Sequence, residues 1–112
     1  MKKLLLSACV ALTAGTALAQ WSTDLTSPLA VSGTERMGAS LPKVHQCPDG
    51  KIWVAWLNWQ DGMNGYIKAQ LLDTDGKELL EPGGIYVSKH QTASWTSNFD
   101  MQVTPEGDCV VC

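Results

Sequence analysis

The sequence predicts an all-β protein made of short antiparallel strands, and three observations support this prediction. Apolar, aromatic and β-branched residues occur in short runs, and no longer stretch keeps a helical period. The runs are separated by Asp-Gly, Asn-Gly and Pro-Gly pairs, which form tight turns. A segment near the C-terminus also repeats the pattern of a segment in the middle of the chain.

Composition limits the size and the class of the protein. The chain has 112 residues, with 8 Lys and Arg against 11 Asp and Glu, which suffices for one small domain and excludes a large two-domain enzyme. The hydrophobic fraction of 45% argues against disorder, and the formal charge of −3 argues against an electrostatic nucleic-acid binder.

Residues 1–19 are expected to be a secretory signal peptide rather than part of the fold. Lys2 and Lys3 form a basic start, residues 4–18 are apolar or small, and an Ala-x-Ala cleavage pattern ends at Ala19. We therefore expect cleavage after Ala19 and a secreted, cell-surface or periplasmic mature chain. The apolar run is too short for a transmembrane helix, so no membrane span is expected after cleavage.

The cysteines bear on processing and on redox chemistry. Cys9 lies in a pattern that resembles a bacterial lipobox, so a lipoprotein anchored through Cys9 is the alternative to free secretion. Otherwise the mature chain keeps Cys47, Cys109 and Cys112, an odd number that disfavours a disulfide scaffold. Two valines separate Cys109 from Cys112, which predicts a strand with the two sulfurs on opposite faces and no metal or redox site.

The longest apolar run, residues 51–59, predicts a central strand. Val54 and Trp56 alternate on one face, and Trp53 and Leu57 on the other, so both faces are apolar. A strand that is apolar on both faces is expected to be buried on both faces.

Three further strands flank the central strand along the chain. Each is separated from its neighbour by a turn or break that contains glycine. Their expected ranges are residues 43–46, 66–72 and 78–88, the last interrupted at Pro82-Gly83-Gly84. Four consecutive antiparallel strands are the content of one β-propeller blade.

An internal repeat extends this pattern along the chain. Residues 41–55 align with residues 98–112 at an offset of 57 positions, which superposes the Pro-Asp-Gly turn on the Pro-Glu-Gly turn and Val44 on Met101. Residues 29–32 align in the same way with residues 85–88. Ordered repeats of about this length are typical of propeller blades.

The expected organisation of the mature chain, residues 20–112, is therefore a partial β-propeller. An N-terminal outer strand and linker would span residues 20–40, one blade residues 41–88, and the start of the next blade residues 89–112. The final apolar run stops without a closing turn, so the chain is expected to be an N-terminal fragment. The alternative fold is a small β-sandwich or meander with recurring hairpin turns.

The runs at residues 49–56, 66–76 and 84–88 resemble the repeat unit of secreted bacterial β-propellers of the sialidase-like (BNR-like) kind. This resemblance implies a propeller fold and an extracellular location. The two Asp-Gly turns lack the residue that separates acid from glycine in the Asp-box of true sialidases. Arg36 is also the only arginine of the mature chain, so a sialidase arginine triad cannot form. The resemblance therefore implies a fold and not glycosidase activity.

The sequence nominates few site residues. Trp59 and Trp95 are candidates for stacking against a ligand, because Trp59 stands beside polar residues at a strand end. The acids at 73, 75 and 78 fit a hairpin turn and not the longer loop that calcium needs. No catalytic residue, no metal ligand and no cofactor-binding residue is nominated.

The favoured function is a secreted, non-catalytic propeller module that offers a binding or scaffold surface to glycans or extracellular proteins. Further blades of a longer chain would be its structural partners, and nucleic acid is not expected as a partner. The alternative is the N-terminal fragment of a propeller-type carbohydrate-active enzyme, sialidase-like or another glycoside hydrolase, whose catalytic residues lie in other blades.

Overall fold

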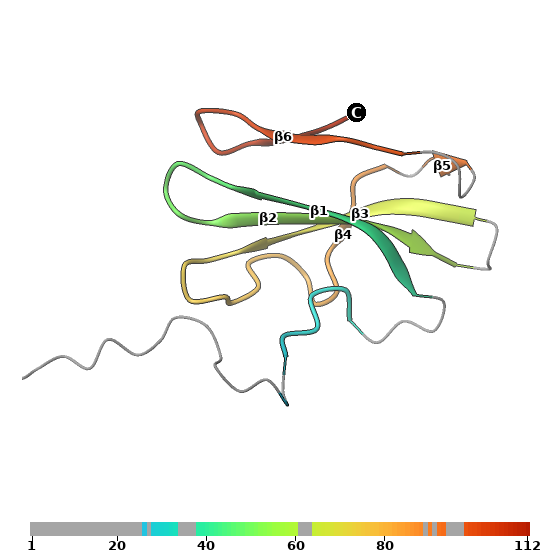
Figure 1. Ribbon diagram of the computed structural model, residues 1–112, viewed down its shortest axis with the longest axis horizontal. Helices are drawn as coiled ribbons and strands as arrows, with labels where there is room; N and C mark the ends of the chain where they lie inside the picture. Colours follow the sequence, from blue (N-terminus) through green and yellow to red (C-terminus); the bar gives the residue numbers. More distant parts are fainter. Residues whose placement is uncertain are drawn as a thin grey trace, which may run out of the picture.

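The computed structural model describes residues 26, 28–33, 38–60, 64–88, 90, 92–93 and 98–112, and in this part of the chain every regular element is a β-strand (Figure 1). All strand pairs are antiparallel, which confirms the predicted all-β class. The strands are β1 (Ala39–Gln46), β2 (Ile52–Trp59), β3 (Asn64–Leu72), β4 (Ile85–Tyr86), β5 (Thr92–Ala93), β6 (Met101–Val103) and β7 (Cys109–Val111). None of the described residues forms a helix that could cross a membrane.

Strands β1 to β4 form one sheet in the order of the chain, and β5 adds to one end of β3. The central strand β2 matches the predicted run and pairs along its whole length with β3. Strand β1 begins earlier than predicted, because the sheet continues past Pro42 through an irregularity between Ser40 and Lys43. Leu41 adopts a left-handed φ of 53° there. The short strand β5 was not predicted.

The fourth strand is shorter than predicted, because a loop replaces its first half. Only Ile85 and Tyr86 pair with β3 as a strand, and Glu78 forms an isolated bridge with Leu72. The loop closes where Gly84 N–H donates to the carbonyl oxygen of Glu81 at 2.8 Å. Gly84 has a φ of 77°, and a Cβ there would lie 2.6 Å from the carbonyl oxygen of Ala69, so glycine is required at this position.

The N-terminal segment differs from its prediction. Residues 28–33 form a turn, in which Gly33 N–H donates to the carbonyl oxygen of Ala30 at 3.1 Å, and no strand is assigned among them. The outer strand expected at residues 29–32 is therefore not formed: this segment folds into a turn with a local hydrogen bond instead of pairing with the sheet. The expected signal peptide with its cleavage site at Ala19, and Cys9, lie outside the described residues.

The two faces of the sheet carry different residues. One face presents Ala55 and Leu57 of β2 with Ile67 and Ala69 of β3, and all four side chains are buried. We call it the covered face. The opposite face carries the alternate residues, among them Val54 and Trp56.

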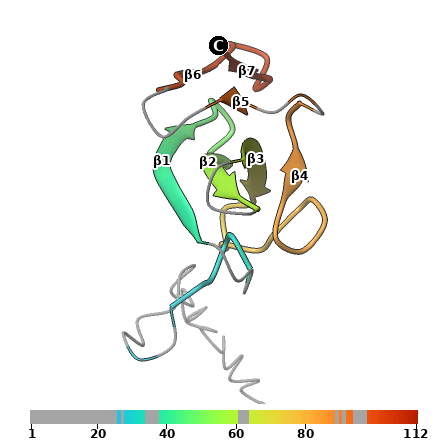
Figure 2. The same ribbon diagram turned by 90° about the vertical axis from the view of Figure 1, so that its right-hand side faces the viewer.

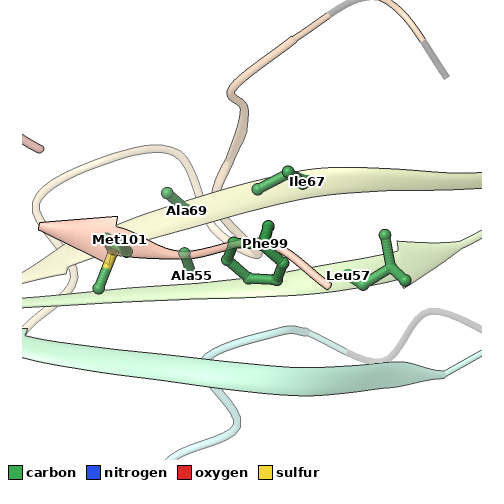
Figure 3. Packing of buried hydrophobic residues seen from close by; sticks show 6 residues of the cluster. All are labelled: Ala55, Leu57, Ile67, Ala69, Phe99 and Met101. Atoms are coloured by element: carbon green, nitrogen blue, oxygen red, sulfur yellow. The ribbon is translucent and has the colours of Figure 1, made fainter. Parts of the chain in front are cut away.

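The β6–β7 hairpin lies on the covered face (Figure 2). Phe99 and Met101, which precede and begin β6, join the buried cluster of the sheet (Figure 3). Cys109 and Val111 of β7 pack against the same cluster. The core therefore lies between two segments that the internal repeat makes equivalent.

The repeat seen in the sequence is also a repeat of structure. Val44 pairs with Val54 in the β1–β2 hairpin, and Met101 pairs with Val111 in the β6–β7 hairpin, so the register is the same at the offset of 57. In both turns a glycine N–H donates to the carbonyl oxygen three residues earlier, at 3.0 Å for Gly50 and 2.9 Å for Gly107. Both glycines have left-handed φ values, 89° and 92°.

The two hairpins are stacked in the same direction. Their turns lie at the same end of the molecule (Figure 1). The indole Nε1 of Trp53 donates to the carbonyl oxygen of Gly107 at 3.0 Å, and the Cys47 thiol lies 3.8 Å from the same oxygen. Each turn is thus held directly against its counterpart.

Candidate functional site

Of the two tryptophans nominated for ligand stacking, the structure describes one. Trp59 is half-buried, packs against the core cluster, and donates from Nε1 to the Ser40 hydroxyl at 2.9 Å. Its polar atom is therefore already used to tie β2 to β1. Trp95 lies outside the described residues.

A different pair of aromatic rings lines an open hollow on the opposite face of the sheet. Tyr66 comes from β3 and Tyr86 from β4, and their ring centroids are 5.8 Å apart at an interplanar angle of 77°, an edge-to-face contact. The hollow has a volume of about 230 Å³ and is completed by Gln60 and Ser88. Its lining combines aromatic walls with one amide and one hydroxyl group.

Strand register creates this pair. Tyr86 pairs with Lys68, two residues after Tyr66 on the same strand, so both tyrosines fall on the same face. The sequence carried a partial signal, since both tyrosines occupy strand positions of matching parity. The pairing register of β3 with β4 depends on the glycine-containing loop that joins them, and the sequence does not define it. The site was therefore not predicted from the sequence.

Hydrogen bonds and a cation fix the position of Tyr86. The Gln60 side-chain amide donates from Nε2 to the Tyr86 hydroxyl at 2.8 Å. The Lys68 Nζ lies 5.0 Å from the centroid of the Tyr86 ring, within the range of a cation–π contact, and the Lys68 side chain is buried. The Tyr86 ring is thus held at its edge and at its face while 45% of the residue stays exposed.

The polar groups of the hollow keep bonding capacity for a ligand. The Tyr86 hydroxyl accepts from Gln60 and still has its own hydrogen to donate. The side-chain carbonyl oxygen of Gln60 has no hydrogen-bond partner among the described residues. The Ser88 hydroxyl accepts the His90 N–H at 3.1 Å and can also donate. The hollow therefore offers both donors and acceptors beside an aromatic wall.

The cysteines lie as the strand pattern predicted. Cys109 packs toward the core and Cys112 is exposed, so the two sulfurs of this pair face opposite ways. Burial raises the pKa of the Cys47 thiol, and the neighbouring Asp49 carboxylate raises it further. Burial also raises the pKa of the Cys109 thiol. The environment of both thiols therefore disfavours the nucleophilic thiolate form.

The acids considered for calcium form a turn. The Asp73 carboxylate accepts the N–H groups of Asp75 and Lys77 at 2.9 and 2.8 Å, which fixes the hairpin between β3 and the loop. Within the described part of the chain, no group of three or more His, Cys, Asp or Glu side chains could hold a metal ion.

No family model, no curated protein and no solved structure matches this chain.

Proposed function

We propose that this chain is an exported, non-catalytic module of the β-propeller type whose Tyr66–Tyr86 hollow binds an extracellular glycan. The hollow carries the binding part of the proposal, because it joins an exposed aromatic wall to donors and acceptors that have spare capacity. The C–H face of a sugar ring packs against an aromatic ring, and its hydroxyl groups need donors and acceptors around it.

The stacked hairpins support the propeller part of the proposal. A blade in a propeller packs its face against the face of the next blade, and both blades have the same strand direction. The β1–β2 and β6–β7 hairpins have this relation, with equal register and adjoining turns.

Equivalent positions in the two hairpins have opposite exposure, which also supports stacked repeats. Met101 is 0% exposed because it lies on the covered face of the first sheet. Its counterpart Val44 points to the opposite face and is 59% exposed. A further sheet packed on that face would bury Val44 as the first sheet buries Met101.

The glycan proposal is tested by nuclear magnetic resonance of the full chain titrated with methyl β-galactopyranoside and methyl β-glucopyranoside. We expect saturation transfer to at least one sugar and shift changes at Gln60, Tyr66 and Tyr86. Tyr86→Ala should abolish the transfer, because the wall and the hydroxyl are both lost. Trp59→Phe is the matched control and should leave it unchanged, since Trp59 is bonded to Ser40.

Two results would overturn the glycan proposal. One is transfer that persists in Tyr86→Ala but is lost in Trp59→Phe, which would assign binding to the tryptophan. The other is the absence of saturation transfer to either sugar, together with shifts of the Tyr66 and Tyr86 resonances when a protein partner binds. That result would make the hollow a protein contact.

A further inference from the structure

A second hollow lies on the covered face, between the β6–β7 hairpin and the outer strands of the first sheet. Cys109 and Val111 of β7 form one wall, and Ala69, Ile85 and Val87 from the β3–β4 region form the floor and the other wall. Trp53 and Tyr86 complete the lining, and the volume is about 230 Å³. Ile85 and Val87 are 39% and 42% exposed, although they belong to the face that the hairpin covers elsewhere.

Strand β7 presents an unpaired edge to this hollow. Asp100 and Cys112 exchange two backbone hydrogen bonds, at 2.8 and 3.1 Å, which makes them a hydrogen-bonded pair of the hairpin. Because such pairs alternate with non-bonded pairs along an antiparallel ladder, the N–H groups of Cys109 and Val111 point away from β6. Among the described residues, β7 pairs with β6 alone.

The equivalent strand in the first sheet shows what such an edge accepts. Ile52 and Val54 of β2 occupy the positions of Cys109 and Val111, and they pair with Leu72 and Gln70 of β3. A strand added to β7 in the same register would lie over β3 and β4 and would cover Ile85 and Val87.

We propose that the free edge of β7 takes up one antiparallel strand of a further repeat of this kind, with apolar side chains opposite Cys109 and Val111. The apolar floor at Ile85 and Val87 requires apolar groups at those positions. The hollow continues the packed contact between the hairpin and the sheet without interruption. This inference rests on the repeat architecture of the proposed function and is independent of the glycan.

A second copy of the chain does not fit the edge through its own β7. In an antiparallel pair of two β7 strands, the inward side chains of both copies face the same side. The first sheet of the second copy lies on that side of its β7, as in the first copy. It would then occupy the space of β3 and β4 of the first copy, so the strand must come without an underlying sheet of its own.

The test extends the full chain after Cys112 with a copy of residues 56–72, which supplies the end of β2, its turn and β3. In the copy, valine replaces Lys68 and Gln70, so that the positions that face the hollow are apolar. The control extension carries aspartate at the same two positions. Hydrogen exchange of individual amides, followed by nuclear magnetic resonance, is measured for all three proteins.

We expect the amides of Cys109 and Val111 to exchange more slowly in the valine extension than in the unextended chain, by a factor of about ten or more. In the aspartate extension these two amides should exchange as fast as in the unextended chain. The amide of Val110, which points toward β6, should change little. Val87→Lys should reduce the new protection, whereas Val110→Lys, on the exposed side of β7, should not.

Two results would overturn the inference. One is a valine extension whose own strand is protected while the amides of Cys109 and Val111 stay fast. The other is an unextended chain that forms a dimer in solution in which these two amides are protected, which would make a second copy the occupant. Neither result bears on sugar binding at Tyr66 and Tyr86.

Discussion

The indole of Trp53 donates a hydrogen bond of 3.0 Å to the carbonyl oxygen of Gly107, 54 residues later in the chain. This bond joins the start of β2 to the turn of the β6–β7 hairpin. The Gly107 turn is the sequence counterpart of the turn that precedes Trp53 itself. A residue of one repeat thus fixes the position of the next repeat.

Trp53→Phe should lower the free energy of unfolding by about 1–3 kcal/mol, because it removes the indole donor to the Gly107 carbonyl oxygen and part of the ring. Urea unfolding followed by circular dichroism measures the change. A loss of stability no larger than that of a substitution at exposed Leu79 would contradict the role given to this bond.

Met101→Ala should lower the free energy of unfolding by about 2–5 kcal/mol, because Met101 is fully buried between the hairpin and the sheet. The matched control is Val44→Ala at the equivalent, exposed position, where the change should stay within about 0.5 kcal/mol. Equal effects at the two positions would show that the hairpin does not lie on the sheet in solution.

Gly84→Ala should be more damaging than Gly38→Ala, although both glycines have left-handed φ values, 77° and 88°. The new methyl at position 84 would meet backbone and the Trp56 ring at 2.6 Å, whereas position 38 opens to free space. We expect about 1 kcal/mol at position 38 from backbone strain and more than about 2 kcal/mol at position 84. Thermal unfolding of both variants measures the difference, and the reverse order would contradict the close approach of the loop to β3.

Stability should fall as pH rises into the alkaline range. The pKa values of Cys47 and Cys109 are raised in the folded chain, mainly by burial, relative to the unfolded chain. Their contribution is therefore complete below the unfolded thiol pKa of about 8.5 and is lost as pH rises through the higher folded values. Cys47→Ser with Cys109→Ser should remove the part of the pH dependence that these thiols cause. Urea unfolding gives the free energy of unfolding at each pH between 7 and 10. If this free energy depended on pH in the double variant as it does in the original chain, the burial of the two thiols would be contradicted.

Local chemistry made the central strand of the first sheet and the turn before it predictable. The run from Ile52 to Trp59 and the Pro-Asp-Gly turn before it determine their structure within a few residues. The offset between Val44 and Met101 also anticipated two hairpins of equal register. Strand β1 begins before residue 43, where it was predicted to start, because the sheet continues past Pro42 with an irregular register.

The candidate site was less predictable, because it depends on register across a loop. Tyr66 and Tyr86 meet only because the chain from Glu81 to Gly84 folds back and sets Tyr86 opposite Lys68. Trp59 has the strand-end position that a ligand platform would need, yet its indole is bonded to Ser40. Neither relation is visible without knowing which residues of adjacent strands are paired.

The most direct test of the stacked repeat is a nuclear Overhauser spectrum of the full chain in solution, with methyl groups labelled. We expect cross-peaks from the Met101 methyl to the Ala55 methyl and from the Phe99 ring to the Leu57 methyls, since these side chains share one buried cluster. Cross-strand peaks between β6 and β7 serve as the internal control for a folded hairpin. Hairpin peaks without any peak to Ala55 or Leu57 would show that the second hairpin folds apart from the first sheet, and would contradict the stacked-repeat account.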